Sequence, residues 1–119
     1  TFLGKGDQSM KVVYFFQSAN AALILENMII PQLGREEHGA EVVGMFFFGD
    51  TTYFFLPEHP IGEQLSRLSS KHGFFIICCD FCCAQRRISG RLYPGTEEGC
   101  FPDVYRKARE RGADQVISL

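Results

Sequence analysis

The sequence predicts an α/β fold in which helices cover both faces of a mainly parallel sheet of four to five strands. Segments with helical spacing separate short apolar segments, and strands that alternate with helices form parallel sheets through right-handed crossovers. The apolar segments are rich in β-branched and aromatic residues, as in buried strands; they cover residues 11–17, 41–48, 74–77 and 115–119. Residues 1–119 have room for one domain with one hydrophobic core.

The first helix is predicted directly after the first strand. Asn20 is a favourable N-cap residue, and residues 21–30 carry apolar side chains at helical spacing. Pro31 is expected to kink or end this helix, because proline lacks the backbone N–H and its ring clashes with the preceding turn. A polar turn over residues 34–39 then leads to the second strand.

Gly49 and Asp50 end the second strand. Residues 51–56 remain aromatic and are expected to form either a short helix or an extended lip. From residue 61 onward, apolar side chains mark one face of a helix, and Gly73 is suited to its C-terminal cap.

The last helix is expected over residues 102–111, after a segment of mixed character that ends at Gly99. Pro102 suits its first turn and Asp103 suits the positive end of the helix dipole. Gly112 suits the position just after the helix, and the final strand follows.

Residues 74–87 contain the candidate reactive site, and the rest of the chain forms its scaffold. A buried strand there runs into a turn that holds four of the five cysteines, namely Cys78, Cys79, Cys82 and Cys83, and then into an arginine-rich segment. If a helix begins at the turn, the Cys79-x-x-Cys82 pair lies at the carboxyl end of a parallel strand, where α/β folds place their chemistry. The amides at a helix N-terminus would then shift a thiol toward thiolate.

Neighbouring side chains in a strand point to opposite faces, so Cys78 and Cys79 cannot both face one site. We expect Cys79 to face the site and Cys78 to belong to the core. Small buried hydrophobic residues are the alternative interpretation of these cysteines.

Composition excludes several classes of protein. The formal net charge of −2 and the scattered basic residues argue against nucleic-acid binding. No apolar run approaches the roughly 18 residues of a membrane span. Residues 1–9 lack the order of a signal peptide and are expected to form a loose leader. Clustered cysteines in an odd number do not suit a secreted disulfide framework, so we expect a cytoplasmic protein.

Three features, in this order, resemble the DsrE/DsrF-like family of small sulfur-relay proteins. A strand ends in Phe46-Phe47-Phe48-Gly49-Asp50, and a second strand leads into Cys79-x-x-Cys82 and an arginine-containing segment ending near Ile88. The third feature is Gly99-Cys100-Phe101, followed by a helix and a closing strand. The resemblance covers most of the chain from about Met10 onward.

The resemblance implies a three-layer α/β/α sandwich, assembly into trimers or hexamers, and a cysteine that carries sulfur as a persulfide. It places this role on Cys79 and Cys82. The chain departs from the family's pattern in Cys78, Cys83 and Arg87, the last standing where a small residue is more usual.

The leading hypothesis is therefore a sulfur-transfer protein that exchanges sulfane sulfur with donor and acceptor proteins and needs no other cofactor. The expected supporting residues are Asp50, Asp80, Cys83, Arg86 and Cys100. For Arg86 the alternatives are an anion-holding role or a solvated face, and for Cys100 a relay thiol or a plain loop cysteine.

Two alternatives belong to other classes of protein. In the first, the cluster from Cys78 to Cys83 chelates a thiophilic metal through Cys79, Cys82 and Cys83. In the second, the protein is an oligomeric regulatory subunit with inert thiols. The sequence contains no glycine-rich nucleotide motif, so a nucleotide cofactor is not indicated.

Overall fold

The sheet has five strands, all parallel, in the order β4-β3-β2-β1-β5. A computed structural model describes residues 9–119 of the chain; residues 1–8, most of the predicted leader, lie outside the described part. The strands are β1 Lys11–Phe16, β2 Glu41–Phe47, β3 Phe75–Cys79, β4 Glu97–Gly99 and β5 Gln115–Ser118. Because every strand runs the same way, all five carboxyl ends lie at one edge of the sheet.

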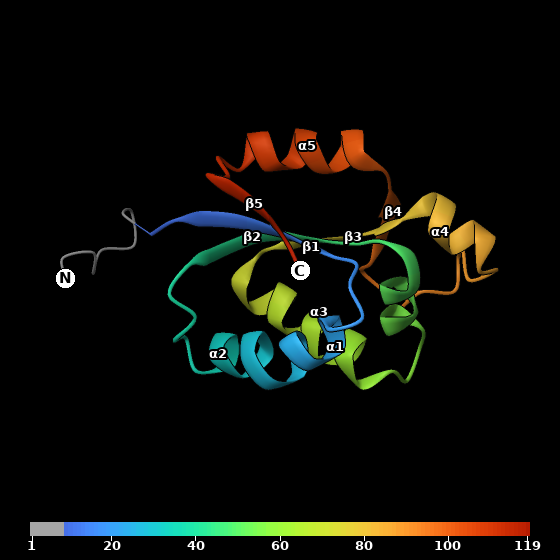
Figure 1. The fold of residues 1–119 in the computed structure, drawn as a ribbon, viewed down its shortest axis with the longest axis horizontal. Coiled ribbons are helices and arrows are strands. Elements are labelled where there is room, and N and C mark those ends of the chain that lie inside the picture. Colours follow the sequence, from blue (N-terminus) through green and yellow to red (C-terminus); the bar gives the residue numbers. More distant parts are fainter. Residues whose placement is uncertain (1–8) are drawn as a thin grey trace.

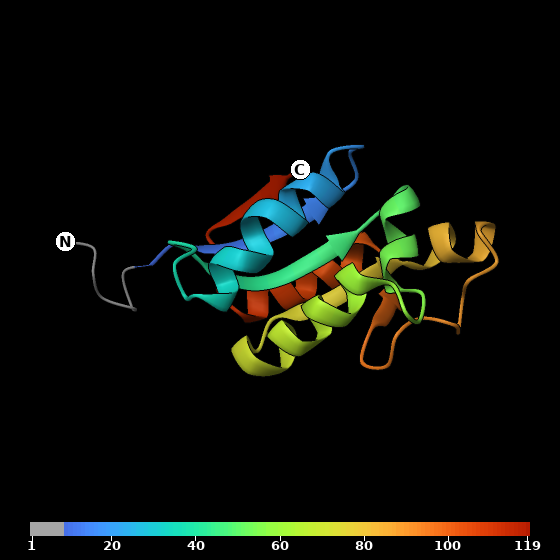
Figure 2. The ribbon, with the colours of Figure 1, turned by 90° about the horizontal axis from the view of Figure 1, so that it is seen from below.

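Helices cover both faces of this sheet, which confirms the predicted three-layer α/β/α architecture (Figure 1). One face carries α5 Phe101–Glu110. The other face, seen from below in Figure 2, carries α3 Pro60–His72 and a continuous helix made of α1 Ala21–Ile24, η3 Leu25–Ile29 and α2 Ile30–Gly34. Among residues 9–119, no helix is both long enough and apolar enough to cross a membrane.

Side-chain alternation along the buried strands produces two separate cores. Val12, Tyr14 and Phe16 of β1 pack toward α1 and α3, in the larger core. Val13 faces the opposite side, where it joins the smaller core beneath α5 with Val104.

Pro31 does not end the helix, which continues through it to Gly34. The preceding segment, Leu25–Ile29, is a π-helix, whose wider turn changes the hydrogen-bond ladder just before the proline. Pro31 then lies in the first turn of α2, where its missing N–H and fixed φ are tolerated.

Of the predicted segment 51–56, residues 51–55 form the helix alternative, within the 3-10 helix η4 Gly49–Phe55, and Leu56 follows in an extended conformation. One threonine hydroxyl holds η4 against the end of β1, and a second one closes the first turn of η4 itself. Thr51 Oγ1 donates to the carbonyl oxygen of Phe16 at 2.8 Å, and Thr52 Oγ1 donates to that of Gly49 at 2.7 Å. η4 therefore fixes the backbone that follows β2.

The third strand extends two residues beyond the predicted 74–77 segment, to Cys79. The short edge strand β4 was not predicted. α3 ends at Gly73, which has the expected left-handed backbone with φ 84°. α4 Asp80–Gln85 follows β3 directly and ends before Arg86, so most of the arginine-rich segment lies beyond this helix.

Candidate functional site

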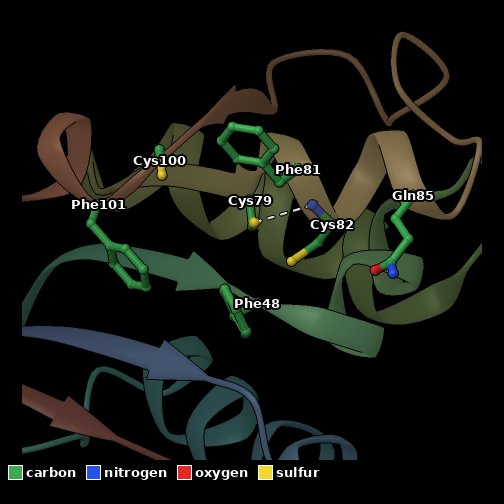
Figure 3. A pocket seen from close by; sticks show the side chains of 7 residues that line it. All are labelled: Phe48, Cys79, Phe81, Cys82, Gln85, Cys100 and Phe101. Atoms are coloured by element: carbon green, nitrogen blue, oxygen red, sulfur yellow. Dashed lines mark hydrogen bonds between the residues drawn. The ribbon is translucent and has the colours of Figure 1, made fainter.

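A pocket of about 460 Å³ lies at the carboxyl edge of the sheet, between the end of β2, the β3–α4 junction and the start of α5. Figure 3 shows the side chains that surround it. Three of them are thiols and three are phenylalanines; the lining residues are Phe48, Cys79, Phe81, Cys82, Gln85, Cys100 and Phe101. The two cysteines predicted to carry the chemistry thus share one pocket.

The turn from β3 into α4 is held by hydrogen bonds within the cysteine motif. Cys79 is the N-cap of α4, and its Sγ accepts the backbone N–H of Cys82 at 3.2 Å. The carboxylate of Asp80 accepts the N–H of Phe81 at 2.8 Å. Asp80 thus supports the helix start, as N-terminal acidic residues do, and does not line the pocket.

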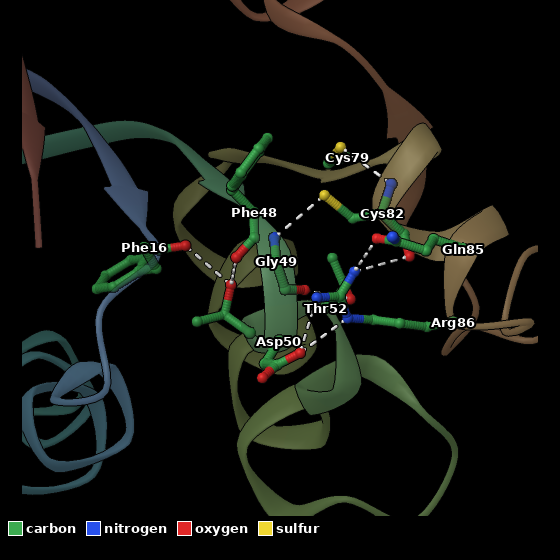
Figure 4. A network of polar contacts seen from close by, with 10 residues as sticks. Phe16, Phe48, Gly49, Asp50, Thr52, Cys79, Cys82, Gln85 and Arg86 are labelled. Atoms are coloured by element: carbon green, nitrogen blue, oxygen red, sulfur yellow. Dashed lines mark hydrogen bonds and ion pairs between the residues drawn. The ribbon is translucent and has the colours of Figure 1, made fainter.

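Cys82 receives a hydrogen bond from a separate part of the chain. The backbone N–H of Gly49, which follows β2, donates to Cys82 Sγ at 3.2 Å (Figure 4). Gly49 has φ 69°, a left-handed conformation that favours glycine. The side chain of Cys82 is 7% exposed and lines the pocket, so this sulfur combines a backbone donor with access to the cavity.

The thiol of Cys79 is not shifted toward thiolate, contrary to expectation. Burial, together with a smaller effect of the side-chain hydrogen bond to Cys82, raises the pKa of Cys79 to about 11. The backbone N–H of Cys82 acts in the opposite direction but does not outweigh burial. Cys79 is therefore a protonated thiol at neutral pH.

Cys78 and Cys83 form a second pair on the opposite side of β3. Both are fully buried, and both belong to the core beneath α1 and α3, whereas Cys79 and Cys82 belong to the core beneath α5. Hydrogen bonding to Cys83 and burial raise the pKa of Cys78, while the same hydrogen bond lowers the pKa of Cys83. The alternation predicted for Cys78 and Cys79 is confirmed.

Arg86 and Asp50 form an ion pair beside the pocket. Arg86 Nη2 and Nε lie 2.8 and 2.9 Å from Asp50 Oδ1, and this contact raises the pKa of Arg86. Arg86 Nη1 also donates to the carbonyl oxygen of Cys82 at 3.2 Å. The pair connects η4 to α4, and neither side chain lines the pocket.

Cys100 faces the pocket from the α5 side, opposite the Cys79–Cys82 pair (Figure 3). It is half-buried and is the N-cap of α5. The backbone N–H of Cys100 donates to the carboxylate of Asp103 at 2.9 Å, which lowers the pKa of Asp103. The structure thus brings this thiol, 18 positions after Cys82, into the same cavity.

The three sulfurs of the metal alternative are not gathered in one place. Cys83 packs with Cys78 on the far side of β3 from Cys79 and Cys82. Within residues 9–119, no three His, Cys, Asp or Glu side chains are grouped as metal ligands.

Several pocket residues had no signal in the sequence. Phe81 is 74% exposed at the pocket wall, and a lone aromatic residue inside a turn has no periodicity to mark it. Phe101 belongs to α5 and Gln85 to α4, and spacing alone does not reveal that these two elements line the same pocket. The N–H of Gly49 is a backbone donor, so only the strand-ending glycine itself could have indicated it.

Comparison with solved structures identifies proteins of the same architecture. The ychN protein from E. coli has a TM-score of 0.67 at 17% identity, covering 93% of this chain and 99% of that chain. The protein of unknown function MTH1491 from Methanobacterium thermoautotrophicum has a TM-score of 0.64 at 10% identity, covering 92% and 99%. This chain has the DsrE/DsrF-like fold.

A third structure with this arrangement is BT1422 from Bacteroides thetaiotaomicron, a conserved protein of unknown function. It has a TM-score of 0.63 at 11% identity and covers 91% of this chain and 94% of that chain. Comparison with protein-family models and with curated proteins gives no match. At these identities the DsrE/DsrF-like likeness concerns the fold, and function has to be argued from the site.

Proposed function

We propose that this protein is a sulfur carrier in which Cys82 holds sulfane sulfur as a persulfide. The observation that supports this role is the hydrogen bond from the Gly49 N–H to Cys82 Sγ, at the wall of a thiol-lined pocket. Backbone N–H groups stabilise a negative charge on sulfur, and the anionic form is the nucleophile. Cys82 is therefore the carrier that we favour over Cys79, whose pKa is raised to about 11.

Loading begins when the Cys82 thiolate attacks the terminal sulfane sulfur of a donor. A new S–S bond forms to Cys82 Sγ, the donor's own S–S bond breaks, and the donor leaves as a thiolate. Delivery is the reverse reaction with another partner: an acceptor thiolate attacks the outer sulfur, and Cys82 leaves as a thiolate. No external oxidant or reductant is needed for either step.

Cys79 provides a second way to unload the persulfide. After losing its proton, Cys79 Sγ attacks Cys82 Sγ, a Cys79–Cys82 disulfide forms, and the outer sulfur leaves as hydrosulfide. A dithiol reductant is then required to restore both thiols. The hydrogen bond between Cys79 Sγ and the N–H of Cys82 keeps the two residues close enough to act as such a pair.

Donor and acceptor proteins are the proposed partners, in a reducing compartment such as the cytoplasm. All five cysteines are free. A homo-oligomer, trimer or hexamer, is part of the same proposal. It is supported by exposed aromatic side chains at and beside the pocket, including Phe48, Phe101 and Tyr105. Native mass spectrometry would report the oligomer directly.

The carrier role is tested by intact mass of protein purified without oxygen, before and after incubation with polysulfide and then reductant. We expect mass increments of about 32 Da per sulfur atom, removable by reductant. Cys82→Ser should abolish the gain, and Cys79→Ser should retain it while losing the disulfide route. Cys83→Ser is the matched control, because this thiol is fully buried on the other side of β3.

Two results would overturn the carrier role. One is loading that survives in Cys82→Ser with the same stoichiometry. The other is a native spectrum with a bound thiophilic metal and no uptake of sulfur, which would favour the chelating module.

A further inference from the structure

The pocket wall is apolar apart from its thiols and Gln85. Phe48 and Phe101 stack with ring centroids 5.9 Å apart and planes inclined by 23°. Phe81 projects from α4 and is 74% exposed, so it lies at the open side of the cavity (Figure 3). Aromatic rings make favourable contacts with polarisable sulfur, and such walls favour apolar ligands.

Three of the backbone donors near this site already have partners. The N–H groups of Phe81 and Cys82 are taken by Asp80 and Cys79, and the N–H of Cys100 is taken by Asp103. Asp80 and Asp103 also bring negative charge to the starts of α4 and α5. An incoming anion would therefore lose its hydration without gaining these three donors, and the lining would offer it chiefly the uncharged amide of Gln85.

The arginine beside the pocket is also engaged. Arg86 is paired with Asp50 at 2.8 Å and donates to the amide oxygen of Gln85 at 3.2 Å. Its guanidinium does not line the cavity, and no lysine, arginine or histidine of residues 9–119 does. The N–H of Gly49 points at Cys82 Sγ itself, where charge is needed for attack and not for binding a donor's head group.

We propose that the pocket selects an uncharged, apolar sulfane, with elemental sulfur or an organic polysulfane as its two sources, and that Phe81 determines this specificity. The proposal rests on the proposed function, because it names the small-molecule donor that loads Cys82. Anionic sulfur compounds are disfavoured by the same walls.

The chemistry balances for both sources. With elemental sulfur, the Cys82 thiolate attacks one ring atom and a ring S–S bond breaks; all the ring sulfurs then form a chain on Cys82 that ends in a sulfide anion. With an organic trisulfide, attack on the central sulfur breaks one S–S bond. One R–S⁻ leaves and takes a proton from solvent, and Cys82 Sγ retains an –S–S–R group.

The test compares loading of the whole protein by matched donors, followed by intact mass. Dipropyl trisulfide and its dicarboxylate analogue share the same reacting atoms and differ in charge, and elemental sulfur is the third probe. Each rate is divided by the rate of the same donor with N-acetylcysteine, which removes intrinsic reactivity. We expect the uncharged trisulfide to be favoured by about tenfold, equivalent to roughly 1.4 kcal/mol of differential binding.

Phe81→Arg places a cation at the open side of the pocket and should lower this preference by about tenfold. Leu23→Arg is the matched control, because Leu23 is 54% exposed on α1, on the other face of the sheet, and should leave the preference unchanged. Circular dichroism of both variants checks that the fold is retained. Comparing elemental sulfur with dipropyl trisulfide identifies which source loads faster.

Equal normalised rates for the charged and uncharged trisulfides would overturn the selectivity, as would an unchanged preference in Phe81→Arg. In both cases Cys82 would still be loaded and the carrier function would stand. If no donor loads the wild-type protein while N-acetylcysteine reacts, the carrier function itself fails.

Discussion

The backbone N–H of Gly49 and the sulfur of Cys82 lie 3.2 Å apart, although 33 positions separate them in the sequence. This hydrogen bond joins the end of β2 to α4 across the carboxyl edge of the sheet. Its geometry depends on the left-handed backbone of Gly49, at φ 69°. The proposed carrier sulfur is therefore sensitive to a change at a residue with no side chain of its own.

Gly49→Ala should lower the free energy of unfolding by about 1 kcal/mol, since a Cβ is disfavoured in the left-handed region. It should also slow alkylation of Cys82, because a relaxed backbone moves the N–H away from the sulfur. Urea denaturation and peptide mapping after iodoacetamide treatment measure the two effects. Gly34→Ala is the control, since Gly34 lies at the end of α2, outside the left-handed region and with free space around it.

Arg87→Gly should stabilise the protein by about 1 kcal/mol, because Arg87 occupies the left-handed region at φ 59° just after α4. Glycine adopts this conformation without the Cβ penalty. Arg91→Gly, also at an exposed arginine but without a positive φ, should not stabilise; equal gains in both variants would refute the backbone explanation.

Stability should fall as the pH decreases below about 6.5, through His38. Its Nε2 accepts from the Tyr14 hydroxyl at 2.6 Å, its Nδ1 donates to Gln32 Oε1 at 2.8 Å, and burial lowers the pKa of His38 from 6.5. The unfolded chain therefore takes up the proton first, so the contribution is complete above the unfolded pKa and is lost on acidification. Urea midpoints from pH 8 to 5 measure this loss, which should shrink in His38→Gln.

Cys79 should react slowly with alkylating reagents in the folded protein. Its pKa rises from 9.0 to about 11, so at pH 8 the thiolate fraction is about a hundredfold below that of the unfolded chain. Higher intrinsic nucleophilicity offsets about tenfold of this, leaving a rate about tenfold lower. Site-resolved mass spectrometry with and without urea tests the value. Equal rates in the two states would show that burial does not hold Cys79 in its protonated form.

The sequence was sufficient to predict the strand–helix alternation, because buried parallel strands leave long apolar runs. It was also sufficient to predict that Cys78 and Cys79 face opposite sides of the sheet, since side-chain alternation is a local property of a strand. Edge strand β4 was missed because its Glu-Glu-Gly sequence has no apolar pattern and is ordered by pairing with β3. The helix end that was one of the two effects expected of Pro31 does not occur, since a π-helical turn before a proline has no clear sequence signal.

The site was predicted in part for similar reasons. The cysteine motif identified Cys79 and Cys82, because C-x-x-C spacing at the end of a strand can be read directly from the sequence. The thiolate expectation for Cys79 failed because a local rule about helix N-termini does not include burial by distant residues. The parts of the pocket wall formed by Phe81 and Phe101 depend on where α4 and α5 lie at the carboxyl edge of the sheet, which no local pattern encodes.

The four neighbouring cysteines lie as two pairs on opposite sides of β3, so one pair can serve as an internal reference when the other is labelled. Cys78 and Cys83 experience the same buffer, redox history and handling as Cys79 and Cys82, but solvent reagents cannot reach them while the fold is intact. Labelling of Cys78 and Cys83 therefore reports unfolding, and labelling of Cys79 and Cys82 alone reports chemistry at the pocket. A single peptide spanning both pairs would thus distinguish damage from function in the same molecule.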